Sequence, residues 1–388
     1  MSFSYFLGLS ALLHLFVGAR IVPALPGIPA LAFSLLLTAS ALMLPLGMLS
    51  RRVARPPLAD TLAWIGLLFM GLFSSLLVLT LLRDSLLLVV WAGTAVLAST
   101  PLASALSTPP GDWLREASAA AVPLLGLLVT AVGFINARRT ARVVTVEVPI
   151  DQLPVALQGF SIVQISDIHV GPTIKQRYLD GIVEAVNRLR PDVVAITGDL
   201  VDGSVAELAG HVAPLARLMS RHGSYFVTGN HEYYSGAHSW IAELERLGVV
   251  VLLNRHVVIE QGLSKLVLAG VADHNAHHFD PAHRSDPLAA LLGAPADAAA
   301  KVLLAHQPRS SSAAAKAGFD LQLSGHTHGG QFLPWNFFVR FQQPFTAGLH
   351  RVDRLWVYVS RGTGYWGPPK RFGAPSEITL LRLVAAAG

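Results

Sequence analysis

Carboxylate, amide and imidazole side chains recur directly after short apolar segments in the second half of the chain. In α/β proteins the carboxyl ends of neighbouring strands meet at one edge, so we expect these side chains to converge there. Oxygen and nitrogen ligands suit Mn²⁺, Fe, Zn²⁺, Co²⁺ or Ni²⁺, whereas Mg²⁺ and Ca²⁺ prefer all-oxygen shells. The chain has no cysteine, which excludes thiolate chemistry and Cys-ligated zinc. The candidate metal ligands are Asp167, His169, Asp199, Asn230, His306, His326 and His328.

The spacing of these residues supports a metal site. Asp167 and His169 are two positions apart, as are His326 and His328. Alternate residues of an extended chain point to the same side, so each pair is expected to bind one cation. Glycines beside Asp199 and other candidates permit tight turns and close approach of the backbone to a metal.

The motifs, taken in order, closely resemble those of the calcineurin-like metallophosphoesterases, in a bacterial membrane-anchored branch. The matching motifs are Asp-x-His, Gly-Asp-x-x-Asp, Gly-Asn-His-Glu, a single His and Gly-His-x-His, and the resemblance extends over residues 143–383. The resemblance implies a four-layer α/β/β/α sandwich with two metal ions, and His231 as proton donor or phosphate contact. It assigns one metal to Asp167, His169, Asp199 and His328, and the other to Asp199, Asn230, His306 and His326, with Asp199 bridging.

The chemistry of phosphoester hydrolysis agrees with this resemblance. The reaction needs a nucleophile at neutral pH and neutralisation of the phosphoryl oxygens, and two cations about 3.5–4 Å apart supply both. The leaving oxygen needs a proton, and imidazole titrates near neutral pH. His231 is the uncommitted histidine nearest a candidate ligand, Asn230.

The elements that would position these residues can be read from hydrophobic periodicity. The predicted helices are Arg177–Leu189 and Ser239–Leu247, and Pro287–Ala300 is expected to form a helix and loop. Residues 143–388 are therefore expected to form one α/β domain. The predicted strands are Phe160–Ile165, Val193–Thr197, Tyr225–Val227, Val249–Leu253, Leu266–Val271, Val302–Leu304 and Leu321–Leu323, with Val143–Pro149 as a lead-in strand.

The first 142 residues have the composition of a membrane domain. The whole chain is 52% hydrophobic and only 14% charged, whereas soluble domains carry about 25% charged residues. A bilayer core requires about 20 apolar residues of helix. We therefore predict an all-α transmembrane region over residues 1–142. Its apolar runs are Tyr5–Ala19, Ile28–Leu49, Leu58–Leu82 and Ala117–Ile135.

Leu86–Ala105 is apolar enough to span or to extend the third helix. Arginines cluster at positions 51–55 and 138–142, and only an even number of spans puts both clusters on one side. We favour four spans, with both termini and the catalytic domain cytoplasmic, in the cell (inner) membrane. The net charge of +5 suits an anionic bilayer or a phosphate-bearing substrate, and no nucleic-acid-binding signature is present.

Several other polar residues have more than one interpretation. Asp202 and Glu232 are expected to orient the site or cap helices and not to bind metal. The histidine-rich segment with His274, His277, His278 and His283 is interpreted as a surface loop, in preference to a third metal site. His14, inside a predicted span, is either functional or paired with a polar neighbour.

Three functions remain open at this stage. The first is hydrolysis of a lipid-linked phosphoester or pyrophosphate, since some relatives that this chain resembles act on UDP-diacylglucosamine. The second is a phosphoprotein phosphatase, but Asp202 is followed by Gly-Ser and not by the Arg-Gly of that branch. The third is a non-catalytic receptor or transporter. Two interpretations are open for four aromatic residues, Trp335, Phe337, Phe338 and Trp366. They line an acyl-chain groove beside the site, or they are core or membrane-contact residues.

Overall fold

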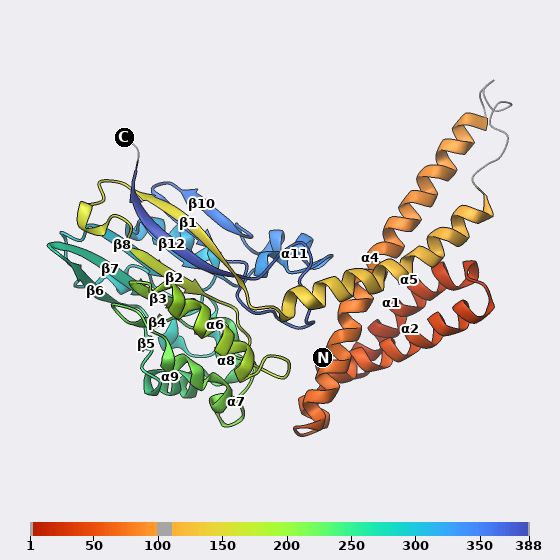
Figure 1. Cartoon of the computed structure of the whole chain (residues 1–388), viewed down its shortest axis with the longest axis horizontal. Coiled ribbons are helices and arrows are strands. Elements are labelled where there is room, and N and C mark those ends of the chain that lie inside the picture. Colours follow the sequence, from red (N-terminus) through yellow and green to blue (C-terminus); the bar gives the residue numbers. More distant parts are fainter. Residues whose placement is uncertain (1–2, 99–110, 387–388) are drawn as a thin grey trace. The chain divides into compact units, whose positions relative to one another are not determined.

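A computed structural model describes residues 3–98 and 111–386 of the chain (Figure 1). The chain divides into two compact units. The helical unit contains residues 1–135 and 367–370, and the α/β unit contains residues 136–366 and 371–388.

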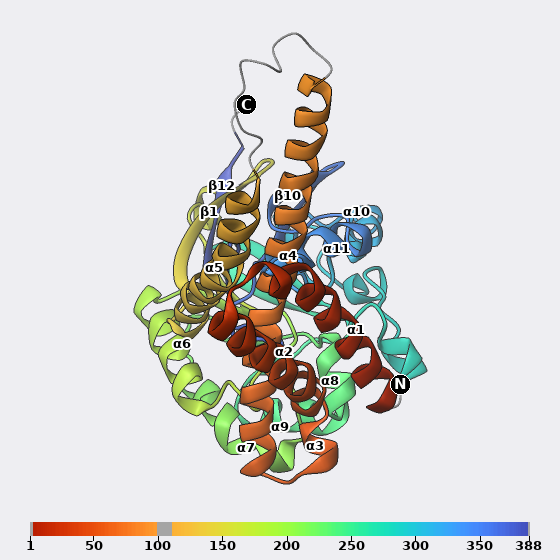
Figure 2. The same cartoon turned by 90° about the vertical axis from the view of Figure 1, so that its right-hand side faces the viewer.

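The helical unit is built from the predicted apolar runs. Within the described residues, four helices are long and apolar enough to cross a membrane. In this unit α2 packs against both α1 and α4 (Figure 2). The backbones of α2 and α4 touch at Gly47 and Gly66, where an added Cβ would lie 2.6 Å or less from the opposite Cα. The helices are α1 (Phe3–Ile21), α2 (Gly27–Met48), α3 (Ser50–Val53), α4 (Leu58–Ala98) and α5 (Asp112–Arg138).

The ambiguous segment Leu86–Ala105 continues α4 as far as Ala98, and its remainder lies outside the described residues. At 1.5 Å per residue, the 41 residues of α4 extend about 60 Å, twice the apolar thickness of a bilayer. Polar contacts lie along α4 at residues 83 and 84, where Arg20 pairs with Asp84 at 2.7 Å and Arg83 donates to the Arg115 carbonyl. At residues 83 and 84, α4 therefore contacts polar groups of other helices and does not face lipid alone.

His14 is paired inside the helical unit. Its Nε2 lies 2.8 Å from the Ser40 hydroxyl and its Nδ1 lies 2.7 Å from the Ser10 carbonyl. The ring also stacks on Phe73 at 3.8 Å between centroids. These contacts satisfy the imidazole within the helices, which favours the second interpretation of this residue.

The α/β unit contains two six-stranded mixed sheets. In the first sheet β2 to β5 are parallel and β12 pairs antiparallel with β2. In the second, β7, β8, β9 and β11 are parallel, with antiparallel strands at both edges. The first sheet has the order β1 (Arg142–Ile150), β12 (Glu377–Ala385), β2 (Ser161–Ile165), β3 (Val193–Ile196), β4 (Ser224–Phe226) and β5 (Val250–Val251). The second has the order β10 (Gly348–Val352), β11 (Leu355–Val359), β9 (Leu321–Ser324), β8 (Ala300–Leu304), β7 (Ser264–Gly270) and β6 (Arg255–Gln261).

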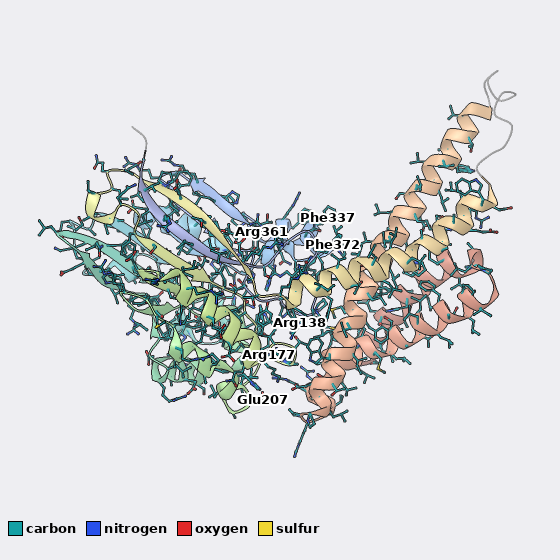
Figure 3. The ribbon with its side chains drawn as sticks, viewed as in Figure 1. Arg138, Arg177, Glu207, Phe337, Arg361 and Phe372 are labelled. Atoms are coloured by element: carbon teal, nitrogen blue, oxygen red, sulfur yellow. The ribbon has the colours of Figure 1, made fainter. Side chains whose placement is uncertain are left out.

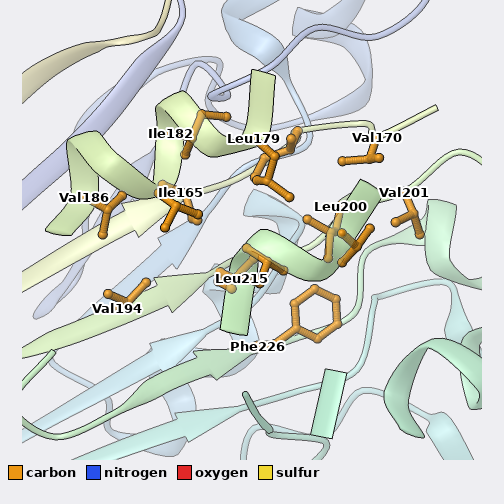
Figure 4. Packing of buried hydrophobic residues seen from close by; sticks show 14 of the residues in the cluster. Ile165, Val170, Leu179, Ile182, Val186, Val194, Leu200, Val201, Leu215 and Phe226 are labelled. Atoms are coloured by element: carbon orange, nitrogen blue, oxygen red, sulfur yellow. The ribbon is translucent and has the colours of Figure 1, made fainter. Parts of the chain in front are cut away.

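Three apolar cores hold the layers together. Helix α6 (Gln176–Leu189) buries Leu179, Ile182 and Val186 on one face, at the spacing of an amphipathic helix, with Phe226 of the first sheet in the same core (Figure 4). A second core fills the space between the sheets, and a third lies where α10 (Ser311–Ala317) covers the second sheet. The four-layer α/β/β/α fold predicted from the sequence is therefore confirmed.

In the α/β unit the eight predicted strands and the helices Arg177–Leu189 and Ser239–Leu247 are present, with ends that shift by at most two residues. The Ala-rich segment Pro287–Ala300 was predicted to hold a helix, but forms only a three-residue 3-10 turn at Ala289–Leu291. Pro287, Gly293 and Pro295 leave too few residues for a helix to propagate. The sequence did not predict β6, β10, β11, β12, α7 (Val205–Val212), α8 (Asn230–Ser235), α10 or α11 (Trp335–Gln342).

Candidate metal centre

The seven candidate ligands come from the ends of strands in both sheets. β2, β3 and β4 of the first sheet are followed by Asp167 and His169, by Asp199 and by Asn230. β8 and β9 of the second sheet are followed by His306 and by His326 and His328. Six of these side chains, all but Asn230, form two groups, and within each group the ligand atoms lie within 4.8 Å of one another.

The first group contains Asp167, His169 and His328. The Nε2 atoms of the two histidines are 3.1 Å apart, and Nε2 of His328 lies 3.6 Å from Oδ1 of Asp167. Ligands bound to one cation at about 2.0–2.2 Å are separated by roughly 3–3.5 Å. The spacing of this group therefore fits one transition-metal ion.

The second group contains Asp199, His306 and His326. Nε2 of His306 lies 3.1 Å from Oδ2 of Asp199 and 3.1 Å from Nδ1 of His326. Asn230 is buried, and its Oδ1 has no hydrogen-bond partner among the residues that the structure describes. A buried carbonyl oxygen without a donor fits a metal ligand, because a cation would satisfy it.

Asp199 faces both groups. Its Oδ2 lies 3.9 Å from Nε2 of His169 as well as 3.1 Å from Nε2 of His306. Its other oxygen, Oδ1, accepts a hydrogen bond from the backbone of His231 at 2.9 Å. This backbone contact holds the carboxylate so that Oδ2 remains directed at the two groups.

The sequence predicted that each of the two i, i+2 pairs would share one cation, and only one pair lies in a common ligand group. Asp167 and His169 do share a group, but His326 and His328 fall into different groups. The reason is that none of these residues is extended: each has φ between 52° and 70°. The i, i+2 rule for strands therefore does not apply beyond the strand ends.

The ligand loops store backbone strain. Asp167, His169, Asp199, His326 and His328 all have left-handed φ, which costs a non-glycine residue about 1–2 kcal/mol. Such strain persists where the surrounding structure enforces it, and it is typical of functional sites. Glycine is required next to these loops, because a Cβ on Gly229 would lie 2.2 Å from Oδ1 of Asp199.

Asp202 and Glu232 form hydrogen bonds of the kind expected for residues that orient the site. Oδ1 of Asp202 accepts hydrogen bonds from Nδ1 of His169 and of His231, at 3.1 and 2.6 Å. Glu232 accepts from the backbone N–H groups of Asp199, Leu200 and Gly229 at 2.6–3.0 Å. Asp202 therefore orients two imidazole rings, and Glu232 links the loop of Asp199 to the start of α8.

His231 lies beside the second group without belonging to it, and it forms a further group of possible ligands with His169 and Asp202. Its Nε2 is 4.0 Å from Oδ2 of Asp199. Burial alone would lower the pKa of His231, but the Asp199 and Asp202 carboxylates raise it to about 9. Burial would raise the pKa of Asp199, but His306 and His231 hold it well below its usual range. These pKa shifts favour an ionised Asp199 beside a His231 that retains its proton.

Arg371 was missed by the sequence analysis. The side chain is 1% exposed and donates to the carbonyls of His328, Arg361 and Gly364 at 2.5–3.1 Å. Its Nη2 also lies 3.2 Å from Nδ1 of His328. Nearby, Arg361, which is labelled in Figure 3, pairs with the buried Glu377 at 2.9 Å. An arginine shortly after a Gly-rich segment was the available signal, but nothing local links it to a ligand 43 residues away.

Part of the histidine-rich segment lies in a separate cluster. Asp280 is 3.0 Å from His238 and 3.9 Å from His283, and Nδ1 of His283 lies 2.8 Å from the Tyr233 hydroxyl. His277 and His278 contact each other at 4.0 Å between ring centroids. His277, His278 and His283 lie in the surface segment predicted from the sequence. His283, with Asp280 and His238, forms a further group whose ligand atoms lie within 4.8 Å of one another, separate from the two ligand groups described above.

Comparisons with known proteins agree with this geometry. Residues 160–330 match the family model described as calcineurin-like phosphoesterase. Proteins named transmembrane protein with metallophosphoesterase domain are 41% identical over 275 residues in Danio rerio and 44% identical over 280 residues in Bos taurus. Both alignments cover 68% of this chain, and the chain spans 63% of the length of each relative.

An uncharacterised metallophosphoesterase of Campylobacter jejuni is 36% identical over 266 residues, which are 67% of this chain and 69% of that protein. Among solved structures, phosphopantetheinyl hydrolase from Mycobacterium tuberculosis aligns with a TM-score of 0.37 and 14% identity, covering 60% of this chain and 100% of that chain. Relatives thus occur in animals and bacteria. With the matched motifs and this degree of identity, the chain belongs to the calcineurin-like metallophosphoesterase family.

Proposed function

We propose that this chain is a membrane-anchored, metal-dependent hydrolase of phosphoester or pyrophosphate bonds. The position of Asp199 supports the proposal most directly, because Oδ2 faces His306 of one ligand group and His169 of the other. A carboxylate in that position suits a centre of two cations. Two divalent cations would activate water and neutralise the phosphoryl oxygens, and Mn²⁺, Fe or Zn²⁺ fit this donor set.

The protein's own residues have separate tasks in this scheme. Asp202 holds the His231 ring by Nδ1, which directs Nε2 towards the ligand groups. His231 would keep its proton on Nε2 until the leaving oxygen accepts it. Glu232 would hold the loops of Asp199 and Asn230 in place relative to each other, because it accepts hydrogen bonds from three backbone N–H groups of these loops. The seven ligands would be Asp167, His169 and His328 on one side, Asn230, His306 and His326 on the other, and Asp199 between them.

A lipid-linked substrate is the proposed target, with a UDP-diacylglucosamine type as one candidate. The observation in favour is that the chain carries four helices suited to a membrane, which would concentrate the enzyme on lipids. We propose residues 1–142 as the anchor and 143–388 as the catalytic domain, of the bacterial membrane-anchored type. The arginine clusters favour a cytoplasmic catalytic face at the cell (inner) membrane.

The test uses the full chain purified in detergent and loaded with Mn²⁺. We expect hydrolysis of p-nitrophenyl phosphate or its bis ester, and loss of one component from a bacterial lipid extract. Variant Asp199→Asn, prepared in parallel, serves as the control for contaminating phosphatases. Equal activity of the wild type and this variant, or no activity on any of these substrates, would refute the proposal.

A further inference from the structure

Helix α11 exposes an unusual amount of aromatic surface for a short helix. Trp335, Phe337, Phe338 and Phe341 are all exposed, and Phe341 is 86% exposed. Val339 is the buried residue of the helix and holds it to the α/β unit. Exposed apolar patches of this kind mark sites of interaction with proteins, ligands or membranes.

This aromatic surface continues to the candidate metal centre. The Trp335 ring is 6.5 Å from the Trp366 ring, which in turn is 5.8 Å from His231. Gln331 holds Trp366 in place by accepting from its backbone N–H and donating to its carbonyl. Phe372, also exposed, and Phe337 are labelled in Figure 3. A molecule bound along these rings would therefore end beside the proposed proton donor.

The charge of the surrounding segment is favourable for a lipid surface. Residues 321–352 contain no Asp or Glu, whereas Arg340 of α11 and Arg351 of β10 are exposed. Tryptophan and phenylalanine with neighbouring arginine are typical of helices that lie in the membrane interface. A soluble protein partner would not require this absence of acidic residues, whereas an anionic bilayer favours it.

We infer that α11, with Trp366 and Phe372, forms an interfacial surface that lies in the bilayer and takes the acyl portion of a lipid substrate. The occupant is the lipid bilayer, and the same chain carries helices that would hold it at a membrane. The choice of substrate rests on the proposed function, but insertion of α11 into lipid does not. The surface would present the phosphate of a bilayer lipid to the metal centre without extracting the whole molecule into water.

Spin labelling of the full chain in liposomes tests the insertion directly. The chain has no native cysteine, so Phe337→Cys and Phe341→Cys would carry the only labels. Leu128→Cys on α5 provides a lipid-facing control, and Leu263→Cys in the fully exposed β6–β7 turn provides a water-facing control. Collisions with oxygen and with a water-soluble nickel chelate are measured for each label.

Labels at 337 and 341 should match Leu128→Cys, with high oxygen and low nickel accessibility. Nickel accessibility equal to that of Leu263→Cys would overturn the inference. Protection from both reagents would also overturn it, because a protein partner or a second copy would then cover the helix.

A kinetic comparison examines the role in substrate capture. The double variant Phe337→Asp with Phe341→Asp should lose at least tenfold in rate on phosphatidic acid in vesicles, relative to its rate on p-nitrophenyl phosphate. The matched control is Leu263→Asp, which should leave this ratio unchanged. An unchanged ratio in the double variant would refute the capture role. If the wild type hydrolyses neither substrate, the proposed function fails, whereas the spin-label result still decides the insertion.

Discussion

Oδ1 of Asp202 lies 2.6 Å from Nδ1 of His231, and the same oxygen lies 3.1 Å from Nδ1 of His169. Asp202 thereby fixes the tautomer and direction of two rings that face the centre. One ring belongs to a ligand group and the other to the proposed proton donor. The carboxylate is therefore a positioning residue for both tasks.

Asp202→Asn should reduce kcat/KM by roughly 10- to 100-fold, the usual cost of losing the partner that orients a ligand histidine. The amide keeps the shape of the side chain but can present its NH₂ to both rings, which would disturb their tautomers. Asp280→Asn is the matched control, because it alters another His–Asp contact, the one with His238. Equal effects of the two variants, or weaker metal binding without slower turnover, would contradict the shared role.

His231→Ala should leave the metal content near that of the wild type and slow turnover by roughly 10²–10⁴-fold. The loss should be smaller for p-nitrophenyl phosphate than for an alkyl phosphate, because p-nitrophenolate leaves without needing a proton. The exposed His238→Ala serves as the control. Loss of one metal equivalent, or equal losses on both leaving groups, would reassign His231 as a ligand or a phosphate contact.

Asp199→Asn should be the most damaging change among the ligands, because its carboxylate faces both groups. Elemental analysis should find about two metal equivalents in the wild type after Mn²⁺ loading. We expect Asp199→Asn to lose most of both, and Asp167→Asn to retain about one, since Asp167 belongs to the first group alone. A wild type that binds no transition metal, or retention of both ions by Asp199→Asn, would exclude a bridging role.

Arg371→Met should destabilise the α/β unit and weaken the first ligand group. The change removes the donor to the carbonyls of Arg361 and Gly364, at about 1–3 kcal/mol for each buried group left unsatisfied. Arg246→Met is the control, since the Arg246 side chain is exposed and its pair with Glu243 is expected to contribute little to stability. Thermal unfolding in detergent and metal content are the two measurements. An unfolding temperature no lower than that of the control would show that Arg371 is dispensable.

A reporter fused after Gly388 tests the proposed topology. With four spans and both arginine clusters in the cytoplasm, a fluorescent protein should be active and alkaline phosphatase inactive. The reverse result would place the catalytic domain outside and require an odd number of spans. Leu86–Ala105 would then be the additional span.

The local features of this protein follow from its sequence because they depend on residue type and short-range periodicity. Uninterrupted apolar runs predict α1, α2, α4 and α5, since lipid requires about 20 apolar residues for each span. Short β-branched runs followed by Asp, Asn and His predict the strand ends that carry the ligands. The weaker strands, such as β12, were missed because their pairing with β1 and β2 comes from distant segments.

The arrangement of the centre depends on tertiary structure. His169 and His328 are 159 residues apart in the chain, and their rings meet because the ends of β2 and β9 come together from two packed sheets. The sequence by itself determined which side chains could bind metal and that the chain carries membrane helices. Only the packing of the two sheets decided that His326 and His328 separate, that Arg371 reaches His328 and that α11 remains exposed. These contacts depend on long-range burial and on left-handed loops, which no local pattern encodes.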